Sequence, residues 1–107
     1  MPRYVAPPGM PAEVEAIIDV IGNRVRVAII RELTQRGPLT APDLSPVAGG
    51  SVSAINRHLR ELEDAGLVST DVPPGERRGR GRAPTWRANR NAVHAYVDQL
   101  RAYLDGE

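Results

Sequence analysis

Apolar side chains recur every three or four residues in five stretches of the chain, which is the spacing of amphipathic helices. In the second stretch, Val25, Ile29 and Leu33 share one stripe, so this helix is expected to be central and mostly buried. Glycines and prolines separate the stretches, as expected for turns. The predicted helices cover about residues 11–21, residues 23–36, a short segment opened by Thr40, residues 51–65, and a last segment from about Asn91.

The third predicted helix is short and contains a proline. Thr40 followed by Asp43 three residues later is a capping signal, and the helix that it opens is expected to bury Leu44 and Val47. Pro46 lies inside this segment, where a proline removes one hydrogen bond and crowds the preceding turn. We therefore expect this helix either to be truncated or to restart at Pro46.

Two strand-like segments follow the fourth helix, at residues 67–72 and 85–89, and a loop rich in arginine and glycine joins them. Trp86 in the second segment is expected to anchor this hairpin by packing. The order of elements predicts a mainly α domain with a small β-hairpin, α-α-α-α-β-β-α. The proline-rich residues 1–10 are expected to form an irregular arm, and residues 11–107 a single domain.

The fourth predicted helix has an apolar face and a polar face. Ile55, Leu59 and Leu62 recur at i, i+4 and i+7 and should face the core. The acidic residues of this helix lie in its C-terminal half, which suits a helix whose first two turns enter a DNA major groove. A solvated helix with ion pairs such as Arg57–Glu61 fits the helix alone equally well. The outward face carries Val52, Ser53, Asn56, Arg57 and Arg60.

The basic residues are clustered, although the net charge is only +1. All 14 are arginine, and six fall within residues 77–90, a span without an acidic residue. Arginine suits bidentate contacts to phosphates and bases and is attracted to a narrow minor groove, while glycine lets the backbone approach a duplex closely. Taken alone, the loop of residues 76–83 would still be interpreted as a solvated basic segment. Its arginines are Arg77, Arg78, Arg80 and Arg82.

The run "IGNRVRVAIIRELTQRGPLTAPDL" followed by "SVSAINRHLRELEDAGLV" resembles the winged helix-turn-helix regulators of the ArsR-like class. The part from Ser53 to Val68 is the most characteristic, and the resemblance covers about residues 12–104. Gly50 departs from the family pattern, which usually places an apolar residue there to pin the turn. His58, at the edge of the buried face, is expected to be packed and hydrogen-bonded.

The resemblance implies a winged helix-turn-helix fold and a sequence-specific, double-stranded DNA-binding transcriptional regulator. A repressor is favoured over an activator. It implies that the helix of about residues 51–65 enters the major groove, and the flanking elements favour a wing, residues 76–83, in the minor groove. The alternative is a winged-helix module for protein–protein interaction without DNA binding. The expected DNA-binding residues are Thr40, Ser51, Val52, Ser53, Asn56, Arg57, Arg60, Arg77, Arg78, Arg80 and Arg82.

The first and last predicted helices have apolar stripes wider than packing within one domain requires. Positions 93, 97, 100 and 104 have coiled-coil spacing, and members of the family dimerise through such terminal helices. We therefore expect a homodimer that binds a palindromic operator, the alternative being that the last helix only covers its own core. The expected dimerisation residues are Val14, Ile17, Ile18, Val93, Tyr96, Val97, Leu100, Tyr103 and Leu104.

Other function classes find little support in the sequence. The absence of cysteine excludes disulfides, thiolate metal sites and cysteine nucleophiles. His94 and Asp98 are spaced i,i+4 and could supply two metal ligands, but the last helix has no second histidine, so no metal site is expected. No phosphate loop, catalytic constellation or cofactor motif is present, and we expect neither an enzyme nor a cofactor. The chain has no signal peptide or membrane-length apolar run, which favours a cytoplasmic protein.

Overall fold

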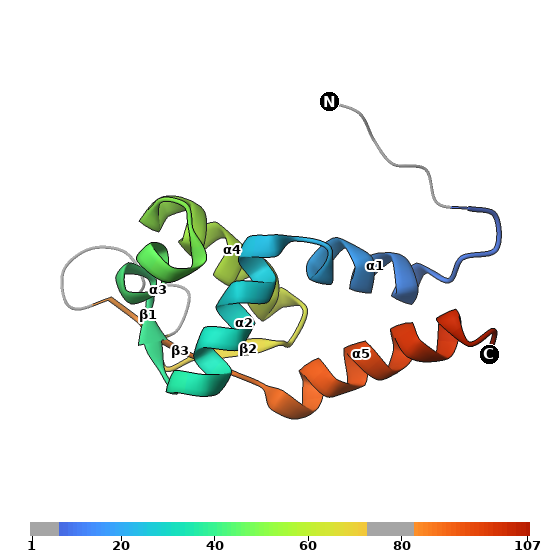
Figure 1. Ribbon diagram of the computed structural model, residues 1–107. Helices are drawn as coiled ribbons and strands as arrows, with labels where there is room; N and C mark the ends of the chain where they lie inside the picture. The colour runs from blue at the N-terminus through green and yellow to red at the C-terminus, as the bar shows by residue number, and fades with distance from the viewer. Residues whose placement is uncertain (1–6, 73–82) are drawn as a thin grey trace.

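The computed structural model describes residues 7–72 and 83–107, and it arranges five helices and three short strands around one core (Figure 1). The predicted order of helices is confirmed. The arginines of the predicted wing, Arg77, Arg78, Arg80 and Arg82, lie outside the described residues. The elements are α1 (Ala12–Ile21), α2 (Arg24–Arg36), β1 (Leu39–Thr40), α3 (Ala41–Ala48), α4 (Val52–Asp64), β2 (Val68–Thr70), β3 (Thr85–Ala88) and α5 (Arg90–Leu104).

Side-chain caps begin three of the helices. Asn23 caps α2 and Ser51 caps α4, each accepting a hydrogen bond from the backbone N–H three residues later. At α3 the predicted capping box is present: Thr40 Oγ1 accepts from the Asp43 N–H at 3.2 Å, and Asp43 Oδ2 accepts from the Thr40 N–H at 3.1 Å. These caps satisfy amide groups that a helix leaves without internal partners, and so they determine where each helix begins.

Helix α3 differs from the prediction in two ways. It is continuous through Pro46, so both the expected truncation and the expected restart were wrong. The capping box at its start and complete burial of Leu44 offset the single hydrogen bond that the proline removes. Val47 is 49% exposed, and its predicted burial was wrong. Ala48, four residues after Leu44, packs against the core instead, because it continues the inner stripe of the helix more closely than Val47 does.

The sheet has three antiparallel strands in the order β1-β3-β2 rather than the two of a simple hairpin. Strand β1 was not predicted, because two residues are too few to show alternation. It pairs with β3 through Leu39 opposite Trp86 and Thr40 opposite Thr85. The strands β2 and β3 are also shorter than the predicted segments. Trp86 is buried at the centre of the sheet, which confirms its role as the packing anchor.

The core lies between α2, α3, α4 and the sheet, and it is aliphatic around the single tryptophan. Ile29 and Leu33 of α2 enter it, which confirms the predicted central position of this helix. Helix α1 packs against α2 and α5, and Figure 1 shows α1 and α5 together at one end of the molecule with α3 and β1 at the other. Among residues 7–72 and 83–107, no helix is both long and apolar enough to cross a membrane.

Candidate nucleic-acid interface

Helix α4 presents one face to the core and the other to solvent, as its sequence predicted. The inner residues Ile55, Leu59 and Leu62 have no exposed surface. On the opposite face Ser53, Arg57 and Arg60 are exposed, Val52 is partly exposed, and Asn56 is half-buried. The inner face holds the helix in place, and the outer face is available to a partner.

The turn between α3 and α4 depends on glycine and on one serine hydroxyl. Gly49 and Gly50 have φ values of 89° and 96°, in the region that favours glycine. The Ser45 hydroxyl donates a hydrogen bond to the Gly50 carbonyl oxygen at 2.6 Å, across the turn. This contact joins α3 to the turn that follows it. Sequence analysis did not identify Ser45, and a hydroxyl residue ahead of a Gly-Gly turn is the signal that could have indicated it.

Thr40 and Ser51, both expected to contact DNA, also act as helix caps. Each hydroxyl oxygen accepts a backbone N–H in its cap. A hydroxyl that accepts in this way still carries a hydrogen that it can donate to a phosphate. Capping and phosphate contact are therefore compatible at both residues.

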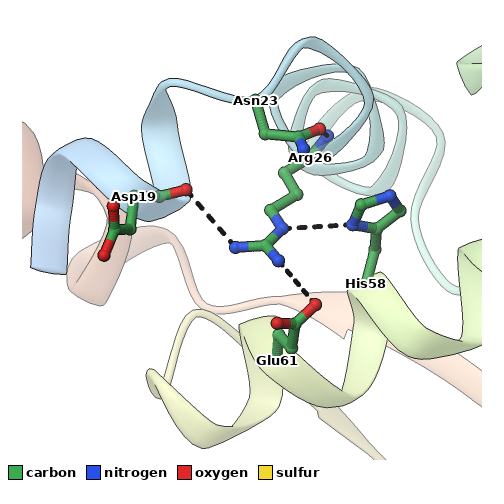
Figure 2. A network of polar contacts seen from close by, with 5 residues as sticks. All are labelled: Asp19, Asn23, Arg26, His58 and Glu61. Atoms are coloured by element: carbon green, nitrogen blue, oxygen red, sulfur yellow. Dashed lines mark hydrogen bonds and ion pairs between the residues drawn. The ribbon is translucent and has the colours of Figure 1, made fainter. Parts of the chain in front are cut away.

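The carboxylate of Glu61 is bound by α2. Arg26 Nη2 lies 2.5 Å from Glu61 Oε1, so the Arg57–Glu61 pair of the solvated-helix alternative is replaced by a contact between helices. His58 accepts a hydrogen bond at Nδ1 from Arg26 Nε at 3.1 Å, which confirms that it is packed and hydrogen-bonded (Figure 2). Burial, followed by the charge of Arg26, lowers the pKa of His58.

The residues expected to mediate dimerisation lie together on α1 and α5, but they differ in burial. Val14 and Ile17 are buried within the protomer and hold α1 in place. Ile18, Val97 and Leu104 remain exposed, Leu104 by 73%. The half-buried members are Val93, Tyr96, Leu100 and Tyr103.

The residues that could have formed a metal site are not assembled into one. Asp98 pairs with Arg101 at 3.3 Å on the surface of α5, and His94 is exposed on the same helix. Within the described part of the chain, no group of three His, Asp or Glu side chains is placed to hold a metal ion. Two ligands on one helix leave a tetrahedral site incomplete.

Comparisons with known proteins agree with this geometry. A family model described as a helix-turn-helix domain matches residues 21–71. This chain is similar to a possible transcriptional regulator for arsenical resistance, whose crystal structure is known. The two sequences are 31% identical, the match covers 85% of this chain and 82% of the other, and the structures superpose with a TM-score of 0.59. The chain belongs to the ArsR-like family of winged helix-turn-helix transcriptional regulators. A search of curated protein sequences finds no significant match.

Two further structures show that this ArsR-like regulator shares its fold with proteins of lower identity. An ArsR-like regulator from Rhodococcus sp. RHA1 is 24% identical, with 89% and 82% of the two chains covered and a TM-score of 0.62. The homodimeric winged helix-turn-helix domain of Mb0332 from Mycobacterium bovis is 17% identical, with 94% and 95% covered and a TM-score of 0.59. As a member of the family, the protein is a DNA-binding regulator, and the matched residues 21–71 contain α3 and α4, the two helices of the helix-turn-helix.

Proposed function

We propose that this ArsR-like regulator is a homodimeric repressor that binds a palindromic duplex, with α4 in the major groove and the arginine-rich wing in the minor groove. The observation that carries the proposal is the two-faced α4, with Ile55, Leu59 and Leu62 fully buried and a polar face open on the other side. A helix held in this way presents the same side chains to each half-site.

The outward side chains match the chemistry of base edges. Arg57 can donate two hydrogen bonds to O6 and N7 of guanine, and Asn56 can pair with adenine. Val52, 40% exposed at the first turn, is suited to a thymine methyl group. Ser53 can bond to a base or a phosphate, and Arg60, a turn further along, suits the phosphate backbone.

The pairing of Glu61 with Arg26 also favours DNA binding. A free carboxylate on the recognition helix would repel phosphate, because the DNA backbone carries one negative charge per nucleotide. Binding by Arg26 directs this carboxylate toward α2 and compensates its charge. Of residues 52–60 of α4, only Arg57 and Arg60 carry a full charge, and both are exposed, so this part of the helix is positive.

A second protomer would cover the apolar surface that the first leaves open. Helix α5 is 15 residues long and has no fully buried residue, although six of its side chains are the apolar ones predicted to dimerise. Two-fold symmetry through α1 and α5 would place two copies of α4 on successive major grooves of a palindrome. The solved M. bovis domain is described as homodimeric. Repression follows where the operator that the dimer occupies overlaps a promoter.

The test begins by selecting bound duplexes from a random-sequence library with the wild-type protein. Binding of a selected and a random duplex is then measured by fluorescence anisotropy at fixed salt, for wild type and Arg57→Ala. The substitution should cost about 1–3 kcal/mol on the selected duplex and relax the preference at one base pair per half-site. Arg24→Ala is the matched control, because Arg24 is exposed on α2.

Three outcomes are informative. A loss confined to the selected duplex supports base contact by Arg57. An equal loss on both duplexes assigns Arg57 to the phosphate backbone. Absence of binding to either duplex at low salt refutes DNA binding by α4 and favours the protein-interaction module.

A further inference from the structure

One arginine side chain connects three helices. Arg26 of α2 is 13% exposed, and each of its guanidinium nitrogens donates a hydrogen bond (Figure 2). Nε donates to His58 Nδ1 at 3.1 Å, and Nη2 to Glu61 Oε1 at 2.5 Å, both on α4. Nη1 donates to the backbone carbonyl oxygen of Asp19 in α1 at 3.4 Å. The same side chain therefore contacts both the recognition helix and α1, which belongs to the proposed dimer seam.

The contacts of Arg26 constrain both the distance of α4 from α2 and the rotation of α4 about its own axis. The backbone N–H of Arg26 is bound by the Asn23 cap at 3.1 Å, so the base of the side chain is also held. His58 and Glu61 are three residues apart and thus adjacent on one face of α4. A rigid planar fork that binds both resists rotation of α4 about its axis. Rotation is the motion that would misdirect Ser53, Asn56 and Arg57.

We propose that Arg26 is a positioning residue that sets the orientation of the recognition helix, and that it does so only while His58 Nδ1 is unprotonated. The inference rests on the proposed function of α4 in DNA binding. Arg26 is not placed to touch DNA itself, because its side chain is enclosed between α1, α2 and α4. Sequence analysis did not assign it any role.

The protonation state of His58 determines whether the contact exists. Neutral His58 with its proton on Nε2 accepts the Arg26 Nε–H, whereas the protonated ring carries hydrogen on both nitrogens and cannot accept. The charges acting on the ring are Arg26 of α2, Glu61 one turn further along α4, and Arg57 beside it. The carboxylate of Asp19 points away from the guanidinium (Figure 2).

These surroundings keep His58 neutral at neutral pH. Burial and the charges of Arg26 and Arg57 lower its pKa below the ordinary value of about 6.5, against the opposing charge of Glu61. The unfolded chain then binds this proton at a higher pH than the folded protein does. The contribution to stability is therefore present above about pH 6.5 and is lost as the pH falls through the lowered pKa.

Acidification is expected to change the affinity for DNA in the opposite direction to the one that electrostatic attraction alone predicts. Protonation adds positive charge to the recognition helix, which by itself strengthens attraction to phosphate. If Arg26 orients α4 through neutral His58, acidification instead weakens binding. The sign of the pH dependence therefore separates a positioning role from a merely electrostatic one.

The experiment uses the full chain and a duplex selected with the wild-type protein. Affinity is measured from about pH 7.5 downwards until an NMR titration of the wild-type protein shows that His58 is protonated, because the lowered pKa of His58 places this point below the ordinary range of histidine. Wild type should lose about tenfold more affinity across this range than His58→Asn, the factor expected for one net charge-assisted hydrogen bond. Asparagine places an acceptor oxygen near the position of Nδ1 but does not titrate, and His94 is common to both proteins.

The second arm requires no DNA. Arg26→Gln should raise the pKa of His58 in an NMR titration and speed amide hydrogen exchange in α4 while leaving α5 unchanged. Arg24→Gln is the control for the lost charge, and Arg26→Lys, which keeps the charge but lacks the planar fork, should fall between wild type and Arg26→Gln. Arg26→Lys also preserves the test if Arg26→Gln fails to fold.

The results separate the two proposals. Wild-type affinity that is unchanged or stronger at low pH relative to His58→Asn would overturn the positioning role, as would unaltered α4 exchange in both Arg26 variants. If the wild-type protein binds no duplex, the proposed function fails. The positioning role is then decided by hydrogen exchange and the His58 titration alone.

Discussion

Leu104 offers the clearest test of the proposed dimer, because its side chain is 73% exposed in the protomer and lies at the end of α5. Replacing it with glutamate removes apolar surface that a partner would cover and places a charge there instead. The protomer's own core is not involved, since Leu104 does not belong to it. The variant should therefore dissociate the dimer without unfolding the domain.

The expected loss of dimer stability follows from the exposure of Leu104. Full burial of a leucine side chain contributes about 1.5–3 kcal/mol, so covering the exposed 73% contributes about 1–2 kcal/mol per copy. Two-fold symmetry repeats the contact, so Leu104→Glu should weaken the dimer by about 2–4 kcal/mol. The dimer Kd should rise by about 30- to 1000-fold, and desolvation of the new charge adds to this loss.

Sedimentation equilibrium measures the dimer Kd directly, and circular dichroism confirms that the variant is folded. Gln99→Glu is the matched control, because Gln99 is exposed on the same helix about 140° from Leu104 around the axis. It introduces the same charge and should leave the dimer unchanged. The reasoning is refuted if wild type sediments as a monomer at tens of micromolar, the concentration at which even a weak dimer forms. It is equally refuted if Leu104→Glu dimerises as wild type does.

Two further predictions concern the wing and the turn. Replacing the four wing arginines with glutamine should flatten the dependence of log K for DNA binding on log salt by about 2–3 units per subunit, with base preference mostly retained. An unchanged slope would show that the wing does not contact DNA. Gly50→Ala should reduce the free energy of unfolding by about 1–2 kcal/mol, because φ at this position is +96° while the added Cβ meets only Ala54 at 3.8 Å. Denaturant titration measures this free energy, and a Gly50→Ala variant as stable as wild type would show that the positive φ causes no strain. The wing arginines are Arg77, Arg78, Arg80 and Arg82.

Features that depend on a short-range pattern of residues could be predicted from the amino-acid sequence. The period of Ile55, Leu59 and Leu62 predicts which face of α4 is buried, because neighbours three and four residues apart share one side of a helix. The caps at Asn23 and Thr40 are equally local, since each joins a side chain to a backbone group three residues away. The family resemblance rests on the same local run, and so it identified the fold.

Contacts between residues far apart in the sequence could not be predicted in this way, because they depend on how the whole chain packs. Strand β1 exists because Leu39 lies opposite Trp86, 47 positions away, and no local alternation indicates it. Exposure of Val47 depends on how α3 is rotated against the core. On this short helix either Val47 or Ala48 could continue the apolar stripe, so the sequence pattern did not decide between them. Arg26 meets His58 across 32 positions of sequence. Such contacts form because packing of the core brings whole helices together, and helical period alone says nothing about which helix lies opposite.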